Sequence, residues 1–175
     1  MGYILEISGN SSYLTAPSNS AYDFGTGDFT LQSWVKTTAS GTIISRKPTP
    51  GGINNGGFLM LIKPGGGIKL AIDNGYGFTE IDASDSIISD GNWHFLTGIR
   101  RNGALEIYMD GSLMGNVMYS SNSNGPYNVN NDSHLYIGSI EQSQEVNAQF
   151  TGMIKEVRIW NYALSWDQIR ALAYK

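Results

Sequence analysis

The sequence predicts an all-β protein, an antiparallel sandwich closed by one short C-terminal helix. Glycine accounts for 22 of the 175 residues, and short apolar or alternating stretches recur between clusters of glycine, asparagine and serine. This pattern is typical of many short strands joined by tight turns. Hydrophobic residues make up 41% of the chain and charged residues 15%, which is apolar enough for a packed core. Helical periodicity is present only near the C-terminus.

The expected strands are short, and several alternate in polarity. Residues 29–36 show the clearest alternation, because every second side chain is Phe, Leu, Ser or Val and these fall on one face. Asn102-Gly103 is the strongest hairpin signal, and Asp110-Gly111 predicts a second tight turn. The expected strands lie at 4–7, 13–15, 29–36, 42–45, 57–62, 68–72, 93–99, 104–109, 112–115, 134–138 and 152–160.

The C-terminal helix is expected to be capped by Ser165. Gln168 stands three residues later, which is the spacing of a capping box. Ile169 and Leu172 then fall on one helical face. Trp166 lies beside the cap and is expected to seal the helix against the sandwich, with exposure as a contact residue as the alternative.

Charge and composition exclude several function classes. The net charge is −4 and the longest basic run is the pair Arg100-Arg101, so nucleic acid is not expected as a partner. The absence of cysteine excludes disulfides and thiolate metal sites. No apolar run reaches membrane-spanning length, and residues 1–6 lack a signal-peptide pattern, which leaves the compartment open. Without a linker or internal repeat, residues 1–175 are expected to form one domain.

Four ordered motifs carry a resemblance to a known family. They are residues 24–36 (FGTGDFTLQSWVK), 90–95 (DGNWHF), 105–111 (LEIYMDG) and 150–160 (FTGMIKEVRIW). Together they resemble laminin-G-like jelly-roll domains, which are related to pentraxins and concanavalin A-like lectins. The resemblance implies a two-sheet antiparallel jelly-roll sandwich that binds a ligand. Trp34 and Trp160, which lie within these motifs, are expected to fill the space between the sheets or to brace an edge.

The resemblance implies a lectin-like module that binds glycans or glycoconjugates without catalysis, in an extracellular role. Calcium is a candidate cofactor, and a homo-oligomer is expected because assembly raises avidity. A protein-binding adhesion domain is the second interpretation, since laminin-G-like domains also recognise protein surfaces. The third is a laminarinase-like glycoside hydrolase, because Glu80, Asp82 and Asp85 nearly reproduce the Glu-x-Asp-x-x-Glu pattern of those enzymes. A retaining glycosidase needs two closely spaced carboxylates.

Two places carry candidate metal ligands. By resemblance to pentraxins, calcium is expected in loops over one sheet face, one of which follows Gly138. A separate glycine turn is bracketed by two aspartates, which offer carboxylate oxygens to a hard cation. The candidate ligands are Glu141, Gln142 and Glu145 after Gly138, and Asp23 and Asp28 at the glycine turn, with the amides Asn54 and Asn55 on a neighbouring loop. The alternative is that these residues belong to solvated loops and turns.

Candidate sugar contacts are aromatic side chains flanked by amides and carboxylates, because rings stack on pyranose faces and polar groups bind hydroxyls. Tyr76 and Phe78 follow the turn at 73–75, and a second group surrounds the long polar loop at 120–126. This second group consists of Tyr119, Tyr127, Asn128, Asn130 and Asp132. The alternative for these tyrosines is a structural role at the rim of a sheet.

Overall fold

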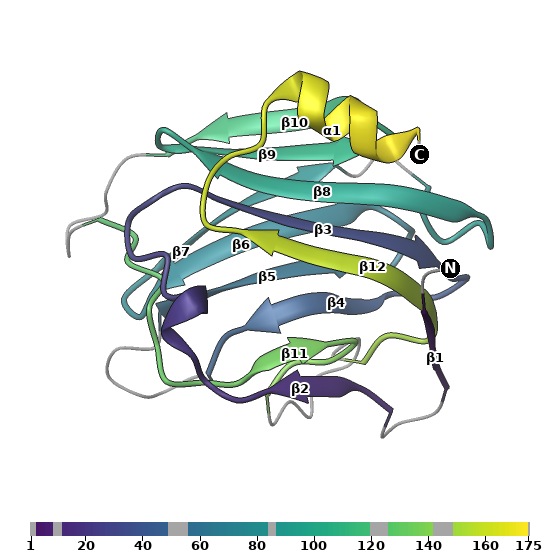
Figure 1. The fold of residues 1–175 in the computed structure, drawn as a ribbon, viewed down its shortest axis with the longest axis horizontal. Coiled ribbons are helices and arrows are strands. Elements are labelled where there is room, and N and C mark those ends of the chain that lie inside the picture. The colour runs from purple at the N-terminus through teal and green to yellow at the C-terminus, as the bar shows by residue number, and fades with distance from the viewer. Residues whose placement is uncertain are drawn as a thin grey trace.

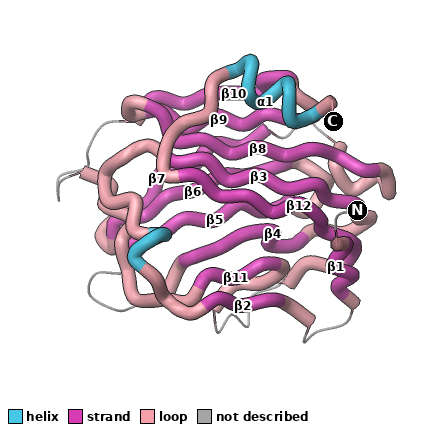
Figure 2. The backbone as a smooth tube through the Cα atoms, viewed as in Figure 1, coloured by secondary structure: helices cyan, strands magenta, loops and turns pink. Residues whose placement is uncertain are grey.

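The computed structural model describes residues 3–8, 12–48, 56–83, 87–119, 126–141 and 149–174. Two six-stranded sheets face each other, and the paired strands within each sheet are antiparallel (Figures 1 and 2). In spatial order, sheet A contains β1 (Ile4–Ile7), β12 (Gly152–Trp160), β3 (Phe29–Lys36), β8 (Trp93–Arg101), β9 (Ala104–Met109) and β10 (Ser112–Met118). Sheet B contains β2 (Leu14–Ala16), β11 (Leu135–Ile137), β4 (Gly41–Arg46), β5 (Gly56–Ile62), β6 (Ile68–Asn74) and β7 (Phe78–Ala83). The 3-10 helix η1 (Ser20–Tyr22) and the α-helix α1 (Trp166–Ala173) complete the elements, so the predicted fold class is confirmed.

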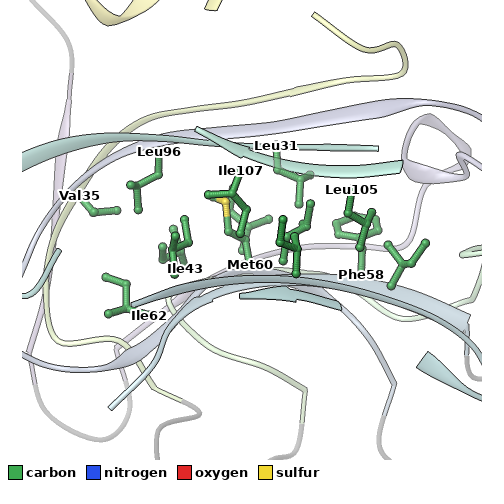
Figure 3. Close-up of a cluster of buried hydrophobic side chains, with 14 of the residues drawn as sticks. Leu31, Val35, Ile43, Phe58, Met60, Ile62, Leu96, Leu105 and Ile107 are labelled. Carbon is green, nitrogen blue, oxygen red and sulfur yellow. The ribbon is translucent and has the colours of Figure 1, made fainter. Parts of the chain in front are cut away.

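The hydrophobic core lies between the two sheets. Leu31 and Val35 point inward from β3, and Phe58, Met60 and Ile62 point toward them from β5; all five side chains are inaccessible to solvent. Figure 3 shows these side chains meeting between the two layers. The period of two along each strand therefore sorts apolar residues inward, as the alternation predicts. Burying each such side chain contributes about 1.5–3 kcal/mol, and this interleaving holds the sheets together.

A second, smaller core lies on the outer face of sheet A. Ile169 and Ala173 of α1 pack against Phe95, Ile99 and Tyr108 of β8 and β9. The predicted capping box is present, because the N-cap side chain accepts a backbone hydrogen bond and the glutamine side chain returns one. The helix thus covers one part of this face of sheet A and leaves the outer face of sheet B without a helix (Figure 1).

Three tryptophans occupy positions that differ from the expectation. Trp34 and Trp160 pack with the cluster beneath α1, so they lie on the outer face of sheet A and not between the sheets. Trp166 is 53% exposed, and Arg170 of the next helical turn lies over its ring at 4.5 Å. The expectation that Trp166 seals the helix is therefore wrong. The side chain of α1 that packs against the sandwich at this point is Ile169, which has no exposed surface.

The two predicted tight turns are confirmed by their backbone angles. Asn102 and Gly103 have φ values of 47° and 79°, and Asp110 and Gly111 have φ values of 50° and 79°. Positive φ at both central positions matches the right-handed twist of a hairpin. The two turns join β8 to β9 and β9 to β10.

The two edges of the sandwich differ. At one edge β10 lies against β7, where Gly115 leaves room for Ile81. At the other edge, β1 and β2 border an apolar cavity of about 280 Å³. Its lining includes Ile4, Leu14 and Val157, and Ile4 and Leu14 are about half exposed. One edge of the sandwich is therefore closed by packing, and the other presents apolar side chains to solvent.

Candidate functional site

The outer face of sheet B carries the largest share of the candidate ligand residues. Because the strands are in register, its outward side chains form rows. The longest row consists of Glu80, Ala71, Leu59, Ser45, Tyr136 and Thr15, one from each strand. Over β4 the row is covered by the chain that follows β11, since Ser45 donates a hydrogen bond to the carbonyl of Ser139 at 2.9 Å. Among the described residues, no comparable segment covers β5, β6 and β7, and this is the open part of the face.

Ion pairs line this open part. Lys69 of β6 and Glu80 of β7 lie diagonally across from each other on adjacent strands. The Nζ atom of Lys69 is 2.7 Å from the Oε1 atom of Glu80. Lys47 Nζ lies 2.9 Å from Asp73 Oδ2. A third pair joins Lys63 to Asp82. The three pairs supply hydrogen-bond donors and acceptors on one surface.

Two exposed aromatic residues stand at the corner of this face. Tyr76 lies in the β6–β7 turn and Phe78 begins β7, and each is 62% exposed. Phe78 pairs across the strands with Asp73, so its ring adjoins the Lys47–Asp73 ion pair. The turn is held by Asn74 Oδ1, which accepts hydrogen bonds from the backbone N–H groups of Tyr76 and residue 77 at 3.2 Å each. Rings beside charged hydrogen-bonding groups can stack on a sugar and bind its hydroxyls.

The other predicted aromatic pair has a structural position. Tyr127 is 8% exposed and belongs to the core between the sheets. Tyr119 packs edge-on against it with 5.3 Å between ring centroids. The buried Arg100 guanidinium donates a hydrogen bond to the carbonyl of Tyr127 at 2.9 Å. Their positions agree with the structural role given above as the alternative. The ring of Tyr127 is buried and offers no open face for a sugar.

The polar residues after Tyr127 connect segments of the fold. Asn130 Oδ1 accepts a hydrogen bond from the backbone N–H of Gly25 at 2.6 Å, and Asn128 Oδ1 accepts one from the N–H of Asn130 at 3.0 Å. Asn131 of the same segment donates to the carbonyl of Gly56 at 2.7 Å. Only Asp132 of the predicted polar group is both exposed and without a hydrogen bond among the described residues.

Asp23 and Asp28 have different partners within the protein. Asp23 Oδ1 lies 2.7 Å from the guanidinium of Arg46, so the cation bound by this carboxylate is an arginine of the protein itself. Asp28 Oδ1 accepts a hydrogen bond from the backbone N–H of Asn102 at 2.9 Å and fixes the β8–β9 hairpin. Across the part of the chain that the structure describes, no group of three or more His, Asp or Glu side chains is placed to hold a metal ion.

Glu141 is the one predicted calcium ligand after β11 that the structure describes. Its Oε2 atom is buried and has no hydrogen-bond partner among the residues that the structure describes. Burial, and then the neighbouring Glu141 carboxylate, raise the pKa of Tyr136. The ring of Tyr136 also lies 5.7 Å from that of Tyr13 and 6.3 Å from that of His134, an aromatic group that sequence reasoning missed. Gln142, Glu145, Asn54 and Asn55 lie outside the described residues.

The stacked six-stranded sheets, with a C-terminal helix on one of them, define a jelly-roll sandwich of the laminin-G kind. The chain belongs to the laminin-G family of the concanavalin A-like lectin/glucanases superfamily, whose profile matches residues 8–170. A search of curated protein sequences found no match. The family resemblance seen in the four sequence motifs is therefore confirmed.

Solved structures share this fold at low sequence identity. Domains LG4-5 of the mouse laminin α1 chain are 19% identical with a TM-score of 0.69, over 89% of this chain and 41% of that one, so this chain spans less than half of that fragment. A heptameric SAP-like pentraxin from Limulus polyphemus is 18% identical with a TM-score of 0.65, over 97% and 80% of the two chains. The CBM40 of the Ruminococcus gnavus IT-sialidase, bound to α2,3 sialyllactose, is 14% identical with a TM-score of 0.71, over 93% and 97%.

Proposed function

We propose that this protein is a non-enzymatic carbohydrate-binding module that binds glycans on the outer face of sheet B, beside Phe78 and Tyr76. The observation that carries the proposal is the pair of aromatic side chains, each 62% exposed, next to a row of ion pairs on a face without a helix. A structurally similar protein, the Ruminococcus gnavus CBM40, is described with a bound sialyllactose. This supports a glycan as the class of ligand.

The physical chemistry of this corner suits a sugar. An exposed ring gains contact area when it stacks on the apolar face of a pyranose, and such stacking fixes the sugar's orientation. The ion pair between Lys47 and Asp73 then offers an ammonium donor and carboxylate acceptors beside Phe78. The ion pair already holds both side chains, so little side-chain entropy is lost when a hydroxyl binds beside them.

Calcium is part of this proposal at Glu141. A buried carboxylate oxygen without a hydrogen-bond partner is costly, and a cation is one group that offsets the cost. Because Glu141 comes immediately after the chain segment that covers β4, an ion bound there would lie at the rim of the same face. A calcium ion there would hold this segment and coordinate sugar hydroxyls.

The test is a glycan-array screen of the purified protein, run in calcium and in EDTA. A defined set of sugars bound in calcium supports the lectin function, and loss of those sugars in EDTA supports the ion at Glu141. Binding that persists in EDTA removes calcium from the proposal and keeps the lectin function. A blank array under both conditions contradicts the lectin function.

The carboxylates of β7 favour binding over hydrolysis. Glu80 is paired with Lys69 and Asp82 with Lys63. Each carboxylate is thus engaged by a lysine of the protein, whereas a glycosidase needs two carboxyl groups that act on the bound sugar. Asp85, the third residue of the glycosidase-like pattern, lies outside the described residues. We therefore propose that the protein does not hydrolyse glycans. The wild type and the Glu80→Gln variant are both expected to leave β-glucans unhydrolysed.

A protein-binding adhesion role is the second candidate, and the open edge of the sandwich favours it. Tyr3, Ile4 and Leu14 are exposed around the apolar cavity of about 280 Å³ between β1 and β2. Exposed apolar side chains beside unpaired strand edges are typical of interaction surfaces. The same edge would support the proposed homo-oligomer, which sedimentation velocity over a hundredfold range of concentration would detect. No helix in the described part of the chain is long and apolar enough to cross a membrane, and the family supports an extracellular role.

A further inference from the structure

We propose that the outer face of sheet A carries a second subsite, formed by Lys36, Lys155, Trp34 and Trp93, that binds the carboxylate or sulfate group of an acidic sugar. This inference rests on the proposed glycan-binding function and adds a preference for acidic over neutral glycans. It places that preference on the sheet opposite to the one that carries Phe78.

Strand register brings the four side chains together. Trp34 and Lys36 are alternate residues of β3, so they point to the same face. Lys155 of β12 pairs with Trp34 on one side, and Trp93 of β8 pairs with Lys36 on the other. All four are partly buried and partly exposed. Figure 1 shows α1 near β8, β9 and β10, with no helix crossing β12 or β3.

The ammonium of Lys155 is held by two indole rings. Its Nζ atom lies 4.6 Å from the ring centroid of Trp93 and 5.2 Å from that of Trp34. An ammonium at this distance is attracted by the negative face of each ring. Unlike a carboxylate, the rings do not neutralise its charge. The side chain is thus positioned before a ligand arrives and keeps its charge for an anion.

The lysines of the two sheets differ in whether they form ion pairs. On the side of sheet B every described lysine is ion-paired with a carboxylate, in the pairs Lys47–Asp73, Lys63–Asp82 and Lys69–Glu80. Neither Lys36 nor Lys155 on sheet A has a carboxylate partner among the described residues. In a protein of net charge −4, two unpaired ammonium groups on one face form a local positive patch.

Nearby acids do not neutralise this patch. Glu156 follows Lys155 in the chain, but its Oε2 atom pairs with Arg158 at 2.8 Å. Glu6 of β1 lies opposite Met153, which separates it from Lys36 on β3. The patch therefore keeps two cationic donors beside two indoles. An acidic monosaccharide satisfies both kinds of group, because its anionic group binds the ammonium groups and its ring contacts an indole.

The test compares acidic sugars with neutral counterparts by titration calorimetry at low ionic strength. The probes are sialyllactose against lactose, and 6-sulfo-N-acetyllactosamine against N-acetyllactosamine. The variant Lys36→Gln/Lys155→Gln removes both ammonium groups, and Arg170→Gln/Lys175→Gln, near the C-terminus, is the control with the same change in net charge. Thermal unfolding of both variants establishes that they are folded. Trp93→Ala is a second variant that removes one indole and leaves the charge unchanged.

We expect the wild type to bind at least one acidic sugar about tenfold more tightly than its neutral counterpart, with the preference decreasing as salt is added. The preference is expected to disappear in Lys36→Gln/Lys155→Gln, to fall in Trp93→Ala and to persist in the control. No preference in the wild type, a preference that survives in the sheet A variant, or an equal loss in both charge variants would overturn the inference.

Failure of this inference is separable from failure of the proposed function. Neutral-sugar binding that depends on Phe78, together with an acidic preference that ignores Lys36 and Lys155, would remove the subsite alone. Acidic-sugar binding that depends on Lys36 and Lys155, without any effect of Phe78→Ala, would retain the subsite and remove the site on sheet B.

Discussion

Replacing Asp23 by asparagine tests the ion pair between Asp23 and the buried Arg46. The guanidinium of Arg46 belongs to a residue that is 0% exposed, and it donates hydrogen bonds to Asp23 Oδ1 at 2.7 Å and to the carbonyl of Tyr22 at 2.9 Å. Further bonds go to the carbonyl of Ser133 at 3.2 Å and to that of Asn131. This side chain ties η1 and β4 to the segment that precedes β11.

The expected loss follows from the exposure of the two partners. Removing one member of a fully buried ion pair costs about 3–5 kcal/mol, because the remaining charge is uncompensated. The Asp23 side chain is 33% exposed, so water takes over part of its role, and the asparagine oxygen still accepts a hydrogen bond. We therefore expect Asp23→Asn to lower the free energy of unfolding by about 1–3 kcal/mol. Asp28→Asn is the matched control and is expected to cost less, since Asp28 accepts only a backbone N–H.

The assay is urea denaturation of the wild type and both variants, with and without calcium. An Asp23→Asn variant within about 0.5 kcal/mol of the wild type would mean that the Arg46–Asp23 ion pair adds little to stability, contrary to this prediction. Calcium that stabilises the wild type but neither aspartate variant would restore the interpretation of Asp23 and Asp28 as a metal site.

Three further predictions concern stability. Burial lowers the pKa of His94, but hydrogen bonds and charges from Asp110 and Asp90 outweigh it and raise that pKa above its ordinary value. This stabilisation is complete below the unfolded-state pKa and is lost as pH rises through the folded-state pKa, so the free energy of unfolding is expected to fall over that window in the wild type; an equal fall in His94→Gln would contradict this. Ile169→Ala is expected to cost about 2–4 kcal/mol in chemical denaturation, because the side chain is fully buried beneath α1; a cost below about 1 kcal/mol would mean that α1 adds little to the core. Ser165→Ala is expected to cost about 1 kcal/mol through loss of the helix cap, and no change in thermal unfolding would contradict that.

Local sequence patterns predict those parts of the fold that depend on neighbouring residues. The alternation in β3, the Asn-Gly and Asp-Gly turns and the capping box at Ser165 are each determined within a few residues, and each is confirmed. Strand β7 is not among the strands expected from the sequence. Two of its outward residues, Glu80 and Asp82, are charged, and the strand is defined by its pairing with β6. Trp34 was misplaced for a related reason: alternation assigns it to one face of a strand but does not say which face lies beneath a helix.

The candidate site was only partly predictable from the sequence. Tyr76 and Phe78 were found because they follow a turn, and the structure exposes both. Tyr127 follows a polar loop in the same way, yet it is buried by contacts with residues distant in the sequence. The double contact of Lys155 with two indoles depends on the pairing of β12 with β3 and of β3 with β8, which no local pattern reveals.

The exposed aromatic corner of sheet B, with Tyr76 and Phe78, is the proposed glycan site. Its most direct test is titration of the tightest sugar from the glycan array into the wild type and into Phe78→Ala/Tyr76→Ala, with Tyr3→Ala as a control for an exposed ring at the opposite edge. We expect the sheet B variant to lose about tenfold or more in affinity and the control to bind like the wild type. Equal affinity in all three proteins would contradict the account and place the glycan site elsewhere on the molecule.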